Sequence, residues 1–389
     1  MTSLRILQIH TYMKSENVNP RAGGKSRVSL MLSRYLLEHG HEVAVYPWPE
    51  KIWGKALPFD AGAEKPVLAI PTLDLPTFTR VGIDYLRVRR THFPQRPGRT
   101  TLTDLLFFTG LQTAIRQFKP DLLHCHQTDS DIPALLQALG RPVPAILTHH
   151  SGRSGEQLQV YDRIIFLSRS MREEVCRGSG FAPEKSTVVY YPILDAFQQG
   201  KIIPATDRQG IVSVGRLTKA KGVDLLLEAY RISANLRKHP LTLCGAGEDE
   251  QEFRDFVRRH HLPVIIKGRL AAEEIRGILS RAKLLVNPSR MEGFSVALLE
   301  ALACGTPVVG WAPQVRELGE WWNTQAGFPF DARTQTAAEL AELVSNALQD
   351  AILRTGDRRE LSRLARESFS MERYGAETMK NYRALLDSG

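Results

Sequence analysis

Two glutamates, Glu292 and Glu300, are the residues of this sequence whose type and spacing are best suited to chemistry. Every residue from 295 to 304 except Ser295 and Glu300 is apolar or small, which predicts a helix buried on nearly all sides. A carboxylate there needs a hydrogen-bond donor, either a structural arginine or a ligand hydroxyl group. Eight positions along one helix separate the two carboxylates by about 12 Å. The N–H groups of residues 293–295 lie between them and favour an anion, so this stretch predicts a site for a sugar, a phosphate and a ribose.

Two strands must hold this helix in place. Residues 284–286 form a short apolar run that is typical of a buried strand, and residues 287–289 break it with a loop. Gly305 and Pro307 end the helix, and the next strand begins at residues 307–309. The site therefore follows the carboxyl end of a strand, where open α/β sheets bind their ligands.

Two cations occupy a similar position earlier in the chain. Arg216 and Lys221 lie in the loop between a strand that begins at residue 211 and a helix that begins near residue 223. An arginine binds a phosphate through its bidentate fork, and a lysine acts as a point charge. This pair therefore predicts a diphosphate site.

These motifs resemble those of the retaining glycosyltransferases of family 4, which have the GT-B fold. Their E-x7-E motif corresponds to Glu292 and Glu300 within EGFSVALLEALACGTPVV, and the string VGRL…KG resembles their diphosphate-binding element. The resemblance implies that Glu292 binds hydroxyl groups of the donor sugar and Glu300 the ribose. Arg216 and Lys221 then stabilise the departing diphosphate. The implied donor-binding residues are Gly215, Gly293, Phe294, Ser295, Val296 and Glu300.

The first half of the chain opens like a Rossmann-like unit. A strand at residues 4–9, a helix at 26–38 and a strand at 43–46 follow one another. Gly23 and Gly24 lie in the turn before the helix, where backbone amides can approach a ligand closely, and the resemblance makes this turn a phosphate and acceptor loop. The glycines do not form G-x-G-x-x-G, so a nicotinamide cofactor is not supported. His10 ends the first strand and is the candidate general base if the enzyme inverts configuration instead.

Histidines end two further strands, at residues 121–126 and 145–150. His124 and His126 point the same way because strand side chains alternate, and D-x-x-H-x-H resembles a family 4 element in which the second histidine faces the donor sugar. The resemblance therefore implies a catalytic role for His126, and His124 is the weaker candidate. The two histidines could bind a metal ion only with a third ligand, and the sequence shows none nearby. Asp129-Ser130-Asp131 spells the D-x-D metal motif of another fold but fits a helix cap before Pro133, so no metal or other cofactor is expected.

The length of 389 residues is suited to two domains. Residues 198–210 are polar and read as a linker, which predicts a first domain at residues 1–200 and a second at 201–370. The family resemblance implies an α/β architecture of two Rossmann-like domains that face each other across a cleft. It also implies that a last helix, at residues 371–389, crosses back to the first domain.

Composition restricts the environment. Cys125, Cys176, Cys244 and Cys304 are scattered without C-x-x-C spacing, which indicates free thiols in a reducing compartment. No apolar run is long enough to span a bilayer, and no signal sequence is present, so we expect a cytoplasmic protein. The net charge of +9 comes without a recognition helix, zinc finger or RNP pattern, which argues against nucleic acid.

One basic segment stands out. Between residues 86 and 99, five arginines occur without an acidic residue and beside Leu86, Val88 and Phe93. This segment is either a solvated loop or a surface for an anionic lipid or phosphorylated acceptor. We therefore expect a transferase that moves a sugar from a UDP- or GDP-type donor to a glycan or lipid-linked acceptor, with peripheral contact at the inner membrane face. The alternatives are an inverting transferase, a nucleotide-sugar epimerase and a binder without activity.

Overall fold

The computed structural model describes residues 2–10, 24–47, 102–126, 143–150, 158–350 and 355–387. The described residues form two compact units. The first draws on Met1–Leu167, Arg172–Val189 and Gly375–Gly389, and the second on Ser168–Met171 and Tyr190–Tyr374. Gly23, the D-x-D at residues 129–131 and the basic segment at 87–99 lie outside the described residues.

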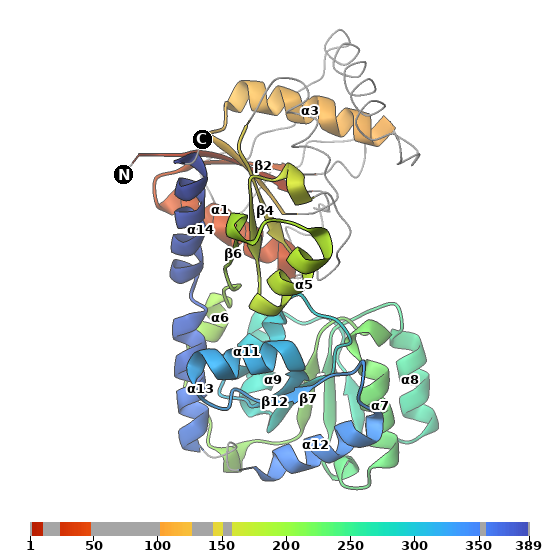
Figure 1. Ribbon diagram of the computed structural model, residues 1–389. Helices are drawn as coiled ribbons and strands as arrows, with labels where there is room; N and C mark the ends of the chain where they lie inside the picture. Colours follow the sequence, from red (N-terminus) through yellow and green to blue (C-terminus); the bar gives the residue numbers. More distant parts are fainter. Residues whose placement is uncertain are drawn as a thin grey trace. The chain divides into compact units, whose positions relative to one another are not determined.

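The first unit is built on a parallel sheet of six strands (Figure 1). In sheet order these are β2 (Glu42–Pro47), β1 (Arg5–His10), β3 (Leu122–Cys125), β4 (Ala145–His149), β5 (Arg163–Phe166) and β6 (Ser186–Val188). All residues of β3 and β4 are buried, as expected for parallel strands covered on both faces.

The helices described in this unit are α1 (Gly24–Glu38), α3 (Leu102–Phe118), α5 (Arg169–Ser179) and α14 (Met371–Leu386). The first residues of α5, and of α14, belong to the second unit. From Gly375 onward α14 packs within the first unit, where a Cβ at Gly375 would collide with the ring of Tyr35 in α1. Only glycine permits this close approach of the two helices.

The second unit is a second parallel sheet of six strands. In sheet order these are β12 (Phe328–Phe330), β11 (Val308–Trp311), β10 (Leu284–Asn287), β7 (Ile211–Val214), β8 (Leu241–Cys244) and β9 (Val264–Ile266). The α/β class with two Rossmann-like halves is therefore confirmed.

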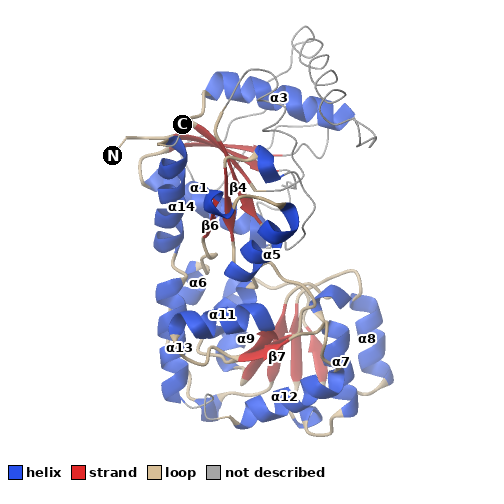
Figure 2. Cartoon of the chain, in the orientation of Figure 1, coloured by secondary structure: helices blue, strands red, loops and turns tan. Residues whose placement is uncertain are grey.

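Helices cover both faces of this sheet (Figure 2). They are α6 (Asp195–Gln198), α7 (Val223–Ile232), α8 (Glu250–Arg259), α9 (Ala272–Arg281), α10 (Val296–Ala303), α11 (Ala312–Trp322), α12 (Ala337–Gln349) and α13 (Thr355–Ser368). α7 packs against α8 and α12, whereas α10 packs against α9 and α13. Right-handed crossovers place these two groups on opposite faces.

The four cysteines are free and buried, which confirms the expected free thiols. Burial raises the pKa of the Cys244 and Cys304 thiols to about 11. In the part of the chain that the structure describes, no helix has both the length and the apolar character needed to cross a membrane.

Candidate functional site

The central strands of the second unit, β7 and β10, define the place of the site. They are hydrogen-bonded neighbours, yet β7 leads to β8 on one side while β10 leads to β11 on the other. This is a topological switch point, where open parallel sheets bind ligands at the carboxyl ends of the strands. Asn287 ties the two ends together: its Oδ1 accepts from the Ser213 hydroxyl at 2.8 Å, and its Nδ2 donates to the Val214 carbonyl at 2.9 Å.

An ion pair lies just beyond these strand ends. Lys221 Nζ is 2.6 Å from Glu292 Oε2, and the hydroxyl of Ser289 donates to Glu292 Oε1 at 2.8 Å. The side chains of Lys221 and Glu292 are 23% and 11% exposed, so the pair is shielded but still accessible. The structure thus brings together Glu292, predicted to bind the sugar, and Lys221, predicted to bind the diphosphate.

The predicted placement of Glu292 on the helix is wrong. Glu292 lies in the loop between β10 and α10, and the helix begins four residues later at Val296. The separation of 12 Å along a helix axis therefore does not apply to the two glutamates. Lys221 and Ser289 hold Glu292 in place instead of helical backbone bonds.

The turn that carries Lys221 depends on a glycine. Lys219–Lys221 form a short 3-10 turn, and Gly222 ends it with φ of 70°. This left-handed conformation favours glycine, and a Cβ at Gly222 would collide with the carbonyl oxygen of Pro288. The loops after β7 and β10 consequently lie in direct contact.

Arg216 lies at the start of the same loop, directly after Gly215. Its side chain is exposed, and its guanidinium forms no ion pair or hydrogen bond with the residues that the structure describes. A cation in this position can bind an anionic ligand, and the diphosphate site stays a prediction.

Glu300 lies in the middle of α10 and is buried, as are its neighbours from Leu298 to Ala303. The carboxyl end of α10 is fixed by two arginines: Arg208 donates to the Cys304 carbonyl at 2.9 Å, and Arg366 to the Ala303 carbonyl at 3.1 Å. Cations at this end of a helix also interact favourably with its dipole. Burial lowers the pKa of Arg208 to about 10. The helix that carries Glu300 is thereby held in one position.

The amino end of α10 differs from the prediction. The Ser295 N–H donates to Gln314 Oε1 at 2.7 Å, and Gln314 Nε2 returns a bond to the Ser295 carbonyl at 3.1 Å. The Ser295 N–H is therefore not available to an anion. The predicted anion site of three successive amides, at residues 293–295, consequently loses one of its three donors. No sequence pattern indicated Gln314, which lies on the next helix.

Phe294 is buried among aromatic rings, 5.3 Å from Tyr190 between ring centroids and 6.0 Å from Phe369. The Tyr190 hydroxyl donates to Glu317 Oε1 at 2.7 Å, and the same carboxylate accepts the Arg169 N–H at 2.8 Å. Burial, reinforced by the bond to Glu317, raises the pKa of Tyr190. Glu317 thus fixes the surroundings of Phe294.

In the first unit, His126 follows β3 and is buried. Its ring centroid lies 4.0 Å from that of His124 and 5.6 Å from that of His150, which confirms that His124 and His126 point the same way. His124 is held by two hydrogen bonds, one between its Nδ1 and the Tyr382 hydroxyl at 2.6 Å and one between its Nε2 and the Thr148 hydroxyl at 2.7 Å. His124 is thus a structural neighbour of His126.

Two further predictions concern this half of the chain. Gly24, which was predicted to lie in the turn before the helix, is instead the first residue of α1. Among the residues that the structure describes, no three His, Cys, Asp or Glu side chains are grouped in a way that could hold a metal ion.

Two family models match the chain. "Glycosyl transferases group 1" matches residues 196–367, and "Glycosyltransferase Family 4" matches residues 22–194. Together they cover most of both units.

Individual proteins show the same likeness. Glycogen synthase of Mycobacterium tuberculosis is 30% identical over 262 residues, 60% of this chain, and the chain spans 62% of its length. The apo form of the lipopolysaccharide outer core galactosyltransferase WaaB has a TM-score of 0.68 at 15% identity, over 99% of both chains. Anabaena Alr3699/HepE in complex with UDP and glucose also has a TM-score of 0.68 at 15% identity, over 98% of this chain and 100% of its own. At these identities the two structures establish the GT-B fold alone.

Proposed function

Because the chain belongs to the glycosyl transferases of group 1, with a family 4 first half, we propose that it is a retaining glycosyltransferase. It moves a sugar from a nucleotide-diphosphate sugar to a glycan or a lipid-linked acceptor. The observation that carries the proposal is the Lys221–Glu292 pair beside an exposed Arg216 at the switch point of the second sheet. A diphosphate needs the cations, and a sugar needs the carboxylate.

In the proposed donor site, different residues bind the sugar and the ribose. Glu292 accepts from Lys221 and Ser289, and since a carboxylate has about four lone-pair positions, it retains capacity for sugar hydroxyl groups. Glu300, on α10, binds the ribose. Gly215, Gly293, Phe294, Ser295 and Val296 line the donor. A UDP-type or GDP-type donor fits this scheme, and HepE supports UDP since its structure contains UDP and glucose.

In the reaction, the bond between the anomeric carbon and the diphosphate oxygen breaks, and a bond to the acceptor oxygen forms on the same face of the sugar. The acceptor proton passes to the leaving diphosphate. Negative charge grows on that diphosphate, and Arg216 and Lys221 stabilise it where preorganised charge contributes most. For His126 we propose the role that the matching family motif gives to its second histidine, toward the donor sugar. The cations supply the charge that a metal ion would otherwise supply, so we propose that no metal is required.

We place the acceptor in cell-envelope polysaccharide or lipopolysaccharide assembly, at the inner face of the membrane. WaaB, with the same fold, is a lipopolysaccharide galactosyltransferase by name. The arginines at residues 87–99 supply attraction to anionic lipid, and the apolar residues among them supply shallow insertion.

The decisive experiment is a product assay. The protein is incubated with UDP- and GDP-sugars, donor cleavage is measured, and the anomeric configuration of the product is read by NMR. Retention is expected. Inversion would point to a general base such as His10, and turnover of the donor into a different nucleotide sugar without acceptor would indicate an epimerase. Binding of nucleotide sugars without any turnover would indicate a binder.

A further inference from the structure

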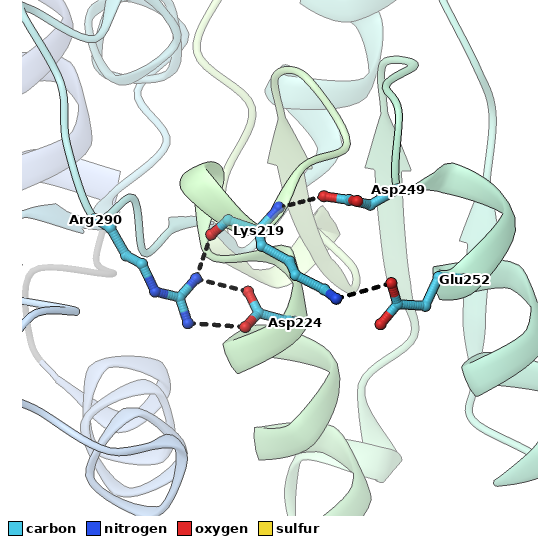
Figure 3. A network of polar contacts seen from close by, with 5 residues as sticks. All are labelled: Lys219, Asp224, Asp249, Glu252 and Arg290. Atoms are coloured by element: carbon cyan, nitrogen blue, oxygen red, sulfur yellow. Dashed lines mark hydrogen bonds and ion pairs between the residues drawn. The ribbon is translucent and has the colours of Figure 1, made fainter.

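A network of charged residues surrounds the turn that carries Lys221 (Figure 3). Its side chains come from three places along the chain: the turn and the start of α7, the start of α8, and the loop after β10. The members are Lys219, Asp224, Asp249, Glu252 and Arg290. None of them is one of the proposed donor-binding residues.

Arg290 is the centre of one side of this network. Its two terminal nitrogens donate to the two carboxylate oxygens of Asp224 at 2.7 and 2.8 Å. One of them also donates to the Lys219 carbonyl, and the backbone N–H of Arg290 donates to the Ala220 carbonyl at 3.0 Å. A single residue thus binds both the backbone of the turn and the first turn of α7.

The other side holds the same turn less firmly. The Lys219 N–H donates to Asp249 at 2.7 Å, and the Lys219 ammonium lies 2.9 Å from Glu252. The side chains of this ion pair are 54% and 58% exposed, against 35% and 32% for Arg290 and Asp224. Exposed single-contact pairs contribute little, whereas a shielded bidentate pair adds both energy and geometric specificity. Arg290 and Asp224 therefore dominate the network.

The position of this pair in the chain gives it a consequence for the site. Lys221 directly follows Ala220, whose carbonyl Arg290 binds, and Glu292 lies two residues after Arg290. Through its guanidinium at the Lys219 carbonyl and its backbone N–H at the Ala220 carbonyl, Arg290 thus joins the turn that carries Lys221 to the loop that carries Glu292. We infer that Arg290 and Asp224 are positioning residues that set the location of Lys221 and Glu292 for catalysis, an inference that rests on the proposed transferase activity.

The test uses Arg290→Lys, which keeps the charge but loses the fork, and Asp224→Asn, which keeps the shape but loses the charge. The matched control is Glu228→Gln. Glu228 and Arg231 form a bidentate pair on the same helix, at 2.6 and 2.7 Å, and contact no residue of the site. Three quantities are measured in each protein: donor kcat/KM, melting temperature, and hydrogen exchange of the amides of Lys221 and Gly222.

These two amides bond to the Thr218 and Lys219 carbonyls within the turn, so their exchange reports its order without any ligand. We expect exchange at least about 10-fold faster in Arg290→Lys and Asp224→Asn but not in Glu228→Gln. We also expect kcat/KM to fall by about 10- to 100-fold, the effect of displacing a catalytic group by about 1 Å. The double variant should be no worse than the worse single one because the pair acts as a unit.

Unchanged amide exchange in both variants would overturn the inference whatever the protein catalyses. Faster exchange with kcat/KM within about 3-fold of the parent would overturn it as well, since the turn would then move without consequence. The inference would also be overturned if the Glu228→Gln control lost as much kcat/KM as the two variants for the same decrease in melting temperature. If the parent transfers no sugar, the proposed function fails, while amide exchange still decides whether the pair orders the turn.

Discussion

Replacing Lys221 by alanine should separate two roles of one side chain, because its ammonium both pairs with Glu292 and faces the proposed diphosphate. One charged donor to a leaving group contributes about 3 kcal/mol to the transition state. At about 1.36 kcal/mol for each factor of ten, turnover should fall by at least about 100-fold. Arg216→Ala should lower it by a similar factor.

The stability cost of Lys221→Ala follows from the burial of the pair. Its side chains are 23% and 11% exposed, which lies between a surface pair of about 0–1 kcal/mol and a buried pair whose disruption costs about 3–5 kcal/mol. We expect the free energy of unfolding to drop by about 2 kcal/mol. In Lys221→Ala/Glu292→Ala the drop should be smaller than the sum for the two single variants, because the same contact is lost in both.

The assay combines donor turnover with urea denaturation of each variant. Lys238→Ala is the control, since it removes one exposed positive charge from the 3-10 turn Leu236–Lys238 and should leave turnover unchanged. Near-normal turnover in both Lys221→Ala and Arg216→Ala would refute the assignment and place the diphosphate elsewhere. Additive losses of stability would show that the 2.6 Å pair does not contribute as the geometry implies.

Three further predictions address the metal, the membrane and pH. Chelation with EDTA should leave turnover unchanged, and activity that is lost and then restored only by a divalent ion would contradict the metal-free scheme. The chain should sediment with vesicles of anionic lipid but not with vesicles of zwitterionic lipid, and high salt should reduce this sedimentation. Equal sedimentation of the parent and a variant with Arg87, Arg89 and Arg90 changed to serine would count against membrane binding. Burial, with smaller contributions from neighbouring cations, lowers the pKa of His41, whose Nδ1 accepts the Leu4 N–H at 3.1 Å. His41 therefore binds a proton more readily in the unfolded chain than in the folded one. The stability that neutral His41 provides is complete above the unfolded pKa of about 6.5, and it should be lost as the pH falls from there through the lower pKa of the folded state. Urea denaturation at pH 7.5 and 5.5 should show this loss reduced in His41→Asn, and an equal loss in both proteins would contradict it.

Local pattern predicted much of the fold and of the site. The apolar run before Asn287 and the small and apolar residues around Glu300 correctly predicted a buried strand and a buried helix. Arg216 and Lys221 could be singled out because both lie in the segment between a predicted strand and the next helix. Their place at the end of β7 needs only the order of elements along the chain.

Contacts between distant segments could not be predicted in this way. The spacing of Glu292 and Glu300 is compatible with one helix, and only the bonds from Lys221 and Ser289 show that Glu292 lies before it. Gln314 lies 19 residues after the amide that it binds, and Glu317 lies 148 residues after Arg169. Partners of this kind depend on the packing of whole helices, which no local period encodes.

The part that α14 plays in the first unit has a consequence for folding during synthesis. Tyr382 bonds His124 inside the first unit, and Gly375 packs on Tyr35 there. Both contacts need residues that the ribosome adds only after the whole second unit. Domains generally fold in the order in which they are made, yet here the first unit to emerge must wait for the second before its core is complete. During that interval Tyr35 of α1 and His124 of β3 lack these partners in the nascent chain.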